Sequence, residues 1–381
     1  MRFMIIKNGI IFRPDNKFHR GTLAIKNVNL VSEIQVYNEN ENEDEIFDAE
    51  NFYIIPGLTD IHFHGCMGYD FCDGKIESFR GIFDYESRNG VTKICPATMT
   101  LPVSELSRIM RAANSFSKEC PGFLGINLEG PFISHAKKGA QNPDYIIPPD
   151  IEILRELQEE SGGLIRIATV APEVDGAISF IQEAKRLARV SIAHTACDYD
   201  TAVRAFDSGA SHVTHLFNAM NPINHRQPGP VIAALENDSV MIEIICDGIH
   251  VHPAVVRNTI RTFGADRVIF ISDSLPPTGM PEGEYTLGGL KIFKNEKAAT
   301  LEDKITLAGS VTNLMECVRR AVFDMNIPLE TAVRCSAVNP VKALGLDDSY
   351  GSIQEGRTAD IVILSKELEV VKVLKLDKLG N

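Results

Sequence analysis

The chain has 381 residues, of which 44% are hydrophobic and 23% charged, and its formal net charge is −13. This composition is typical of a globular protein that can bury a large core. The acidic charge and the lack of a basic block argue against nucleic acid or an anionic membrane as a partner. No apolar stretch reaches the length of about 20 residues that a membrane-spanning helix needs.

The eight cysteines form no CxxC pair and have no regular spacing. In a chain of this length they indicate reduced thiols rather than a disulfide framework. The N-terminal run MRFMIIKNG is interrupted by Asn-Gly too early for a secretory signal peptide. We therefore expect a cytoplasmic protein.

The first 53 residues have the pattern of β-structure. Apolar runs at residues 3–6, 10–12, 22–25 and 34–37 are separated by turn residues such as Asn8-Gly9. The polar, acidic run from Asn38 to Glu45 is predicted to be a solvated loop.

The middle of the chain alternates between strand and helix patterns. The predicted strands are residues 53–64, 91–98, 123–129, 164–171, 190–195, 213–217, 240–246 and 268–272. The predicted helices between them are residues 76–89, 104–117, 151–161, 177–188, 201–208 and 253–263. This order predicts an α/β fold with a closed parallel (β/α)8 TIM-type barrel. A doubly wound open sheet ranks second, because no GxGxxG follows an early strand.

The C-terminal part adds two helical patterns, at residues 311–324 and 329–344, and then returns to β-structure up to residue 364. We expect this last segment to pair with the N-terminal strands in a small β-sandwich. The predicted domains are therefore a sandwich of residues 1–53 and 347–381 and a catalytic barrel of residues 54–346.

Side chains that bind metals follow several predicted strands of the barrel. His62 and His64 are two residues apart, so on a strand they project to the same face. Further candidates close other strands, and they are Glu129, His194, His215 and Asp273. The carboxyl ends of barrel strands meet at one rim, where active sites lie. Four imidazoles and a carboxylate there predict a site for one or two divalent metals, Zn2+ first, with Fe2+, Mn2+ and Co2+ as alternatives.

Such a centre predicts a metal-dependent hydrolase. A bound metal lowers the pKa of a water molecule to about 7, which provides hydroxide at neutral pH. Asp273 is placed to act as the general base and then as the acid that protonates a leaving amine. His212 precedes His215 by three residues, so on a strand it faces the opposite way, and it is predicted to be a structural or surface residue.

Five segments resemble the amidohydrolase superfamily. They are PGLTDIHFHG at 56–65, LEGPF at 128–132, THLFNAM at 214–220, DGIH at 247–250 and ISDS at 271–274. Within the superfamily, the LEGPF and HLFNAM blocks resemble the N-acetylglucosamine-6-phosphate deacetylase family. The similarity runs nearly from end to end of the chain.

The resemblance implies hydrolysis of the N-acetyl group of N-acetylglucosamine 6-phosphate in amino sugar catabolism, by a homodimer with active sites near the subunit interface. It implies that Glu129, His194 and His215 bind a metal, and that His62 and His64 hold a second metal in some members. Asp273 matches the catalytic acid and base. The residues that fall where the family contacts the sugar phosphate are Ala140, Gln141, Asn218, Ala219, Arg226, His250, Leu307, Ala308 and Gly309. For Arg226 this implies that the guanidinium binds the phosphate group.

Gln141 departs from the family pattern, because many members have a histidine there that helps to polarise the acetyl carbonyl. A glutamine amide can donate a hydrogen bond to the same oxygen but cannot carry a charge. Either a second metal at His62 and His64 takes over the polarisation, or the reaction is slower. The sequence leaves both open.

Two other functions have weaker support. A cyclic-amide hydrolase of the dihydroorotase or hydantoinase type usually carries a bridging carboxylated lysine, and the predicted strand at residues 164–171 has no lysine. A non-catalytic sugar-phosphate binding protein would need a broken set of ligands, and none of the candidate ligands is missing. The native metal, the number of metals and the tolerated sugar epimers stay open.

Overall fold

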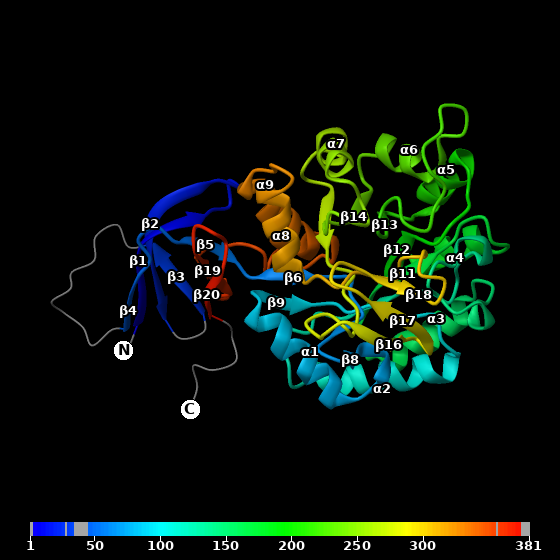
Figure 1. The fold of residues 1–381 in the computed structure, drawn as a ribbon, viewed down its shortest axis with the longest axis horizontal. Helices are drawn as coiled ribbons and strands as arrows, with labels where there is room; N and C mark the ends of the chain where they lie inside the picture. Colours follow the sequence, from blue (N-terminus) through cyan, green and yellow to red (C-terminus); the bar gives the residue numbers. More distant parts are fainter. Residues whose placement is uncertain (1–2, 27–28, 34–44, 356, 375–381) are drawn as a thin grey trace.

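The computed structural model describes residues 3–26, 29–33, 45–355 and 357–374. Figure 1 shows a small β-sheet unit, drawn in blue and red, beside a larger unit of alternating strands and helices. No helix in the described ranges has both the length and the apolar character that crossing a membrane requires.

Eight short strands of the large unit follow one another in chain order. They are β6 (Leu58–Asp60), β9 (Val91–Ile94), β10 (Ile126–Leu128), β11 (Ile165–Val170), β12 (Arg189–Ile192), β13 (His212–Val213), β14 (Met241–Ile245) and β15 (Val268–Ile271). β10 to β15 form a parallel sheet, β6 pairs with β9 in parallel, and bridges such as Ile94–Phe123 join β9 to β10. The N–H of Asp273 donates to the carbonyl of His62 at 2.9 Å, which links the last strand to the first. The predicted α/β barrel order is confirmed.

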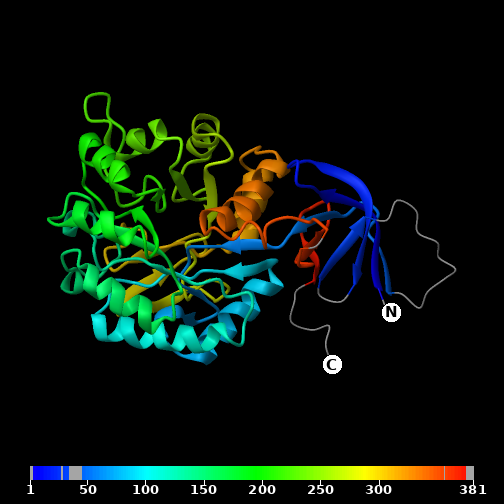
Figure 2. The same ribbon diagram turned by 180° about the vertical axis from the view of Figure 1, so that it is seen from behind.

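Helices cover the outside of these strands, as the view from behind shows (Figure 2). They are α1 (Ile76–Arg88), α2 (Val103–Ser117), α3 (Ile151–Glu160), α4 (Ala177–Ala184), α5 (Tyr199–Ser208), α6 (Gly229–Glu236), α7 (Pro253–Phe263) and α8 (Leu314–Phe323). Short 3-10 turns lie at Phe71–Asp73, His135–Lys137 and Pro143–Tyr145. α6 was not predicted, because most of its residues are small or apolar and buried, which leaves no amphipathic pattern.

The predicted helix at residues 329–344 is divided into three pieces. α9 (Leu329–Val333) leads into a π-helical turn (Arg334–Val338), and α10 (Asn339–Ala343) follows. Pro340 has no N–H to donate, so a regular helix cannot pass through this position without losing a hydrogen bond. The turn also lets the side chain of Asn339 donate to the carbonyls of Ala265 and Val268, at 2.7 Å each.

The first predicted strand, residues 53–64, is wrong in its extent. Its first half is β5 (Tyr53–Pro56) in the small sheet, and its second half is β6 in the barrel. Gly57 lies between them, where an added Cβ would come within 2.0 Å of the hydroxyl of Thr92. The chain therefore passes from one unit to the other at a point of close contact.

The small sheet joins the two ends of the chain. Its order is β20-β19-β5-β1-β2-β3, with β4 paired to β1. The strands are β1 (Phe3–Phe12), β2 (Phe18–Lys26), β3 (Asn29–Glu33), β4 (Glu45–Asp48), β19 (Ile361–Leu364) and β20 (Val370–Leu374). β19 runs antiparallel to β5, so the predicted return of the C-terminal segment to the N-terminal strands is confirmed. The predicted strand at residues 34–37 and most of the acidic run at 38–45 lie outside the described residues, and the predicted domain boundaries stay a prediction.

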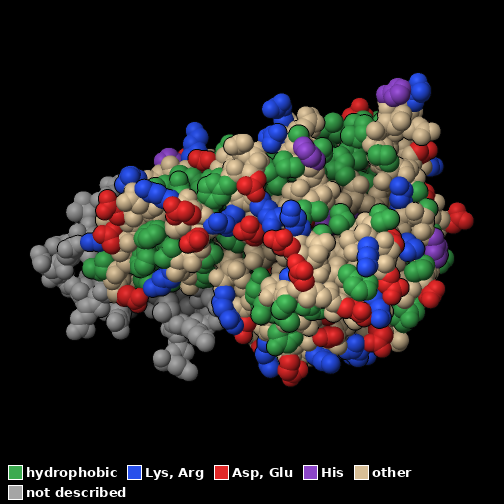
Figure 3. Space-filling view, in the orientation of Figure 1, with side chains coloured by type: hydrophobic (Ala, Val, Ile, Leu, Met, Phe, Trp, Pro, Cys, Tyr) green, Lys and Arg blue, Asp and Glu red, His purple; other side chains and the backbone are tan. Residues whose placement is uncertain are grey.

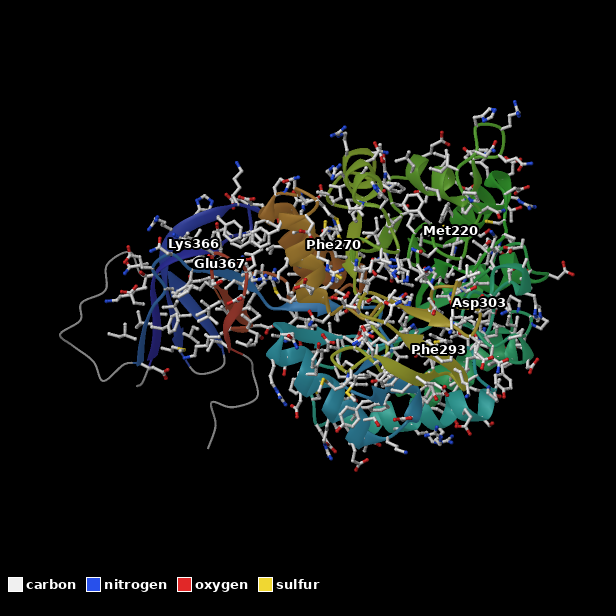
Figure 4. The ribbon with its side chains drawn as sticks, in the orientation of Figure 1. Met220, Phe270, Phe293, Asp303, Lys366 and Glu367 are labelled. Atoms are coloured by element: carbon white, nitrogen blue, oxygen red, sulfur yellow. The ribbon has the colours of Figure 1, made fainter. Side chains whose placement is uncertain are left out.

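The small sheet has its own buried core, separate from the large core of the barrel. Its members include Ile6, Ile11, Leu23, Ile54 and Ile363. Side chains also fill the space between the barrel strands and the helices, where Phe270 of β15 is fully buried (Figure 4). The guanidinium of Arg319 in α8 donates to the carbonyl of Glu367, which lies between β19 and β20 in the same view.

Two further β-elements were not predicted. β7 (Gly65–Cys66) and β8 (Tyr69–Asp70) form a small hairpin after β6. β16 (Gly283–Leu287), β17 (Leu290–Lys294) and β18 (Ala299–Leu301) form an antiparallel sheet between β15 and α8, drawn in yellow (Figure 1). A two-residue turn at Gly288-Gly289 joins β16 to β17, as is common in hairpins.

Candidate metal centre

The predicted metal-binding residues meet at the carboxyl ends of the barrel strands. His62 and His64 follow β6, and Glu129 directly follows β10. Three more lie two residues after the ends of β12, β13 and β15, and they are His194, His215 and Asp273, respectively. All six side chains are buried. The structure therefore brings together, at one rim, residues that are far apart in the sequence.

Glu129 lies in the middle of this group. Its Oε1 is 2.9 Å from Nε2 of His215, 3.1 Å from Nε2 of His194 and 3.5 Å from Nε2 of His62. Its Oε2 is 3.4 Å from Nε2 of His64. One carboxylate thus faces four imidazoles.

Two sets of ligand atoms are close enough to hold a metal. The atoms of His62, Glu129 and His215 lie within 4.8 Å of one another, and so do those of His62, His64 and Asp273. Among the described residues, Nε2 of His62 is buried without a hydrogen-bond partner. A buried polar atom left unpaired costs about 1–3 kcal/mol, and a bound cation would remove that cost. Nitrogen and carboxylate donors in these groups fit a divalent metal such as zinc.

Neighbouring ionisable groups in the centre shift one another's pKa values. Burial alone would lower the pKa of His62, but the carboxylates of Glu129 and Glu243 outweigh it and raise that pKa well above its usual value. Burial would raise the pKa of Glu129, but His62 and the hydrogen bonds of His194 and His215 hold it well below its usual value. Glu129 is therefore ionised, as a metal ligand must be.

Glu243 forms hydrogen bonds with two histidines inside the barrel and was not predicted to belong to the site. Its Oε2 lies 2.8 Å from Nδ1 of His62, and its Oε1 lies 2.9 Å from Nε2 of His212. Burial would raise the pKa of Glu243, but the positive charge of His62 and the hydrogen bond with His212 lower it to about 2. A carboxylate that fixes a metal-binding histidine through its second nitrogen is a frequent feature of metal sites. The signal in the sequence was a lone glutamate inside the apolar run MIEII at 241–245.

The prediction that His212 faces away from the site is wrong, because His212 forms a hydrogen bond with Glu243 inside the barrel. The alternation argument fails because β13 contains only two residues, so the extended backbone ends before His215. His215 has a φ of +30°, and two further candidate ligands, His194 and Asp273, also have positive φ values, of +43° and +50°. Left-handed backbone at non-glycine residues is strained and is found at functional sites.

A cavity of about 190 Å3 opens above the centre. Five of the six candidate metal ligands, all except His62, line it. Eight of the predicted substrate-contacting residues also line it, and they are Ala140, Gln141, Asn218, Ala219, His250, Leu307, Ala308 and Gly309. Lining residues that were not predicted are Met99, Gly139, Ile245, Leu287 and Thr306. Leu287 belongs to the unpredicted sheet of β16 to β18, which explains why no strand-end argument found it.

Gly309 is required for the position of Asp273. A Cβ at Gly309 would lie 2.5 Å from the carbonyl oxygen of Asp273 and 3.1 Å from its Oδ1. The next residue, Ser310, donates its N–H to the same carbonyl at 2.7 Å. The segment after β18 therefore packs directly against the candidate acid and base.

His250 connects two walls of the cavity. Its Nδ1 lies 2.7 Å from a carboxylate oxygen of Asp247, and its Nε2 lies 3.0 Å from the carbonyl oxygen of Ala308. Burial would lower the pKa of His250, but the hydrogen bond and charge of Asp247 raise it. Both ring nitrogens thus face oxygen acceptors, so that His250 holds Asp247 and the segment of Ala308 together.

Arg226 is the one predicted substrate-binding residue that the structure places outside the cavity. It is exposed on the loop between β13 and α6, which projects from the body at the upper right of Figure 1. The same projection carries a histidine and a basic side chain at its tip in Figure 3. None of the described residues that line the cavity is a lysine or an arginine.

Comparisons with known proteins agree with this geometry. Residues 53–379 match the model of the Amidohydrolase family. The N-acetylglucosamine-6-phosphate deacetylase of Bacillus subtilis (strain 168) is 34% identical over 374 residues, which cover 96% of this chain and 91% of that protein. The N-acetylgalactosamine-6-phosphate deacetylase of Escherichia coli O157:H7 is 32% identical over 86% of both chains. A mutant of the N-acetyl-D-glucosamine-6-phosphate deacetylase of Mycobacterium smegmatis, solved in complex with N-acetyl-D-glucosamine-6-phosphate, superposes with a TM-score of 0.92 at 30% identity, covering 99% of this chain and 98% of that one.

Proposed function

The chain belongs to the amidohydrolase family, and on that premise we propose that it hydrolyses the N-acetyl group of N-acetylglucosamine 6-phosphate, giving glucosamine 6-phosphate and acetate. The observation that carries this proposal is the buried group of Glu129, His194 and His215, which lines one cavity together with Asp273. Relatives named for this activity align over nearly the whole chain. The role in amino sugar catabolism follows from the same reaction.

We propose that Glu129, His194 and His215 hold one divalent cation, and that His62, His64 and Asp273 offer a second position. The nitrogen-rich donor set favours Zn2+, with Fe2+, Mn2+ and Co2+ as alternatives. When bound, such a cation lowers the pKa of water toward neutrality and polarises a carbonyl oxygen.

Asp273 is proposed to carry the proton transfers. Its carboxylate takes a proton from the water that attacks the acetyl carbon, and later gives a proton to the amide nitrogen as the C–N bond breaks. The second transfer matters because an unprotonated amine is a poor leaving group. Oδ1 of Asp273 lies 3.2 Å from Nε2 of His64, which places it at the edge of the metal group and beside the cavity.

The sugar is proposed to bind along the cavity residues Ala140, Asn218, Ala219, His250, Leu307, Ala308 and Gly309. Its phosphate group needs a cationic side chain. Arg226 is proposed as the group that binds the phosphate, because none of the described residues that line the cavity is a lysine or an arginine. Because Arg226 lies outside its own cavity, a second copy of the chain is the simplest way to bring it to one. The proposed homodimer accounts for this arrangement.

Mixing two inactive variants tests whether Arg226 acts across the dimer. Arg226→Ala and Asp273→Asn are unfolded and refolded together, so that mixed dimers form. If Arg226 comes from the partner, about a quarter of the wild-type rate returns, because half of the dimers are mixed and each has one complete site. If the mixture stays inactive, Arg226 acts within its own subunit or not at all.

The substrate proposal is tested by acetate release from N-acetylglucosamine 6-phosphate, the unphosphorylated sugar and N-acetylgalactosamine 6-phosphate. We expect turnover of the phosphorylated glucosamine derivative and little of the unphosphorylated sugar. The galactosamine derivative is included because one relative is named for it. Turnover of neither phosphorylated sugar by metal-loaded protein would direct the search to other amides, including cyclic ones, although β11 lacks the lysine that those enzymes usually use.

The proposed location is the cytoplasm. All eight cysteines are free thiols, and seven of them are buried. Free thiols of this kind are typical of reducing compartments.

A further inference from the structure

The amide of Gln141 is held at both ends. Its Nε2 donates to Oε2 of Glu129 at 3.0 Å, and its Oε1 accepts the N–H of Thr100 at 2.7 Å. The side chain is also buried, at 2% exposure. These contacts fix the plane of the amide, so that it cannot turn without losing a hydrogen bond.

This arrangement selects which oxygen of Glu129 faces the imidazoles. With Oε2 bonded to Gln141, Oε1 faces His215 and His194 at 2.9 and 3.1 Å. A carboxylate otherwise rotates about its terminal bond. A neutral amide stops this rotation without adding a charge that would compete with a cation.

The loop that carries Gln141 also orients a second ligand. The carbonyl oxygen of Lys137 lies 2.9 Å from Nδ1 of His194, and the N–H of Gln141 donates to the carbonyl of Lys138 at 2.9 Å. The second hydrogen bond closes a tight turn. Residues 137–141 therefore hold two of the three side chains of the group formed by Glu129, His194 and His215.

We propose that Gln141 is a positioning residue for the metal centre, acting through Glu129, and that its amide is not the group that polarises the acetyl oxygen. The inference rests on the proposed function in one respect, namely that Glu129 is a metal ligand. It predicts that Gln141 determines metal affinity more than substrate affinity.

The test measures zinc affinity of the purified protein by competition with a chelator, without substrate. In Gln141→Leu, which keeps the volume and removes both hydrogen bonds, we expect zinc to bind about 10–100-fold more weakly, the usual effect of losing such a partner. KM for N-acetylglucosamine 6-phosphate should change little once the variant is saturated with zinc. Gln158→Leu is the matched control, because the amide of Gln158 donates to the carbonyls of Ile165 and Leu187, away from the centre. It should leave zinc affinity unchanged.

Gln141→Glu gives a second, independent readout. One oxygen of the new carboxyl group can still accept from Thr100, while the other would face the carboxylate of Glu129. The ratio of variant to wild-type zinc affinity should therefore be lowest at neutral and alkaline pH and rise toward 1 as the new group is protonated.

Wild-type zinc affinity in Gln141→Leu, together with a raised KM or a lowered kcat, would overturn the proposal and make Gln141 a substrate-contacting group. If circular dichroism shows that Gln141→Leu does not fold, Gln141→Met, which also lacks the amide, takes its place. Because zinc affinity is measured without substrate, the outcome does not depend on whether N-acetylglucosamine 6-phosphate is hydrolysed.

Discussion

At the scale of single residues, the pKa values of buried carboxylates in this protein shift in opposite directions according to their partners. Glu129 and Glu243 are buried among histidines, and both have lowered pKa values. Glu86 is also fully buried, but neither of its side-chain oxygens has a hydrogen-bond partner among the described residues. Comparing these three glutamates therefore distinguishes the effect of a charged partner on the pKa from the effect of burial.

Replacing Glu243 by Gln tests its support of His62. The amide can hydrogen-bond only one of the two imidazoles as an acceptor, and the negative charge that raises the pKa of His62 is lost. We expect metal affinity to fall by about 10–100-fold, measured by chelator competition. Glu86→Gln is the control, and equal metal affinities of the two variants would contradict the role of Glu243.

Glu86 makes a prediction about pH. Burial raises its pKa well above the usual value, and the nearby charge of Asp60 adds to this effect. The folded state then keeps a proton that the unfolded state releases above about pH 4.3, so this group makes stability fall as pH rises.

Glu86→Gln removes this titration, so its stability relative to the wild type should rise between pH 5 and pH 8. The measurement is the free energy of unfolding by denaturant at both pH values. Parallel pH dependences of the two proteins would show that Glu86 is not held neutral in the folded state.

At the scale of elements, the sequence predicts the site because a barrel brings all strand ends to one rim. Placing Glu129 and His215 required only their positions after apolar runs, and small errors in strand length did not matter. Arguments that depended on regular extension failed, since β13 is too short to set the direction of His212. The sheet of β16 to β18 was not predicted, because it belongs to no strand–helix unit. Leu287 of the cavity wall lies in this sheet, so it was not predicted either.

The segment after β18 packs against Asp273, so a substitution there tests how precisely the carboxylate must be placed. In Gly309→Ala, the added methyl group would meet the backbone and Oδ1 of Asp273, so the carboxylate must move. A displacement of about 1 Å can lower kcat roughly 100-fold. We expect this loss while the protein keeps its metal, as determined by elemental analysis; an unchanged kcat would show that Asp273 tolerates the shift.

At the scale of the whole molecule, a buried ion pair joins the barrel to the small sheet. Nζ of Lys93 in β9 lies 2.7 Å from a carboxylate oxygen of Asp360, and the hydroxyl of Thr92 donates to the same oxygen at 2.7 Å. The carbonyl of Asp360 accepts the N–H of Gly57 at 3.0 Å. Asp360 directly precedes β19, so these contacts fix where the C-terminal segment returns to the N-terminal strands.

Breaking this pair from one side should be costly. Lys93→Met leaves the carboxylate of Asp360 buried without its partner, which costs about 3–5 kcal/mol of stability in comparable pairs. Lys93→Met combined with Asp360→Asn should lose less than Lys93→Met alone. Denaturant unfolding of the single and double variants measures the coupling, and strictly additive losses would argue against it.

The central claim is that the metal centre and Asp273 together release acetate from N-acetylglucosamine 6-phosphate. The most direct measurement compares the rate of acetate release by the wild type and by Asp273→Asn, with metal content determined on the same samples. We predict that the wild type loses activity on chelation and regains it when metal is restored. Asp273→Asn should keep at least the metal held by Glu129, His194 and His215, yet lose at least about 100-fold in rate. A variant that retains metal and a rate near that of the wild type would contradict the claim.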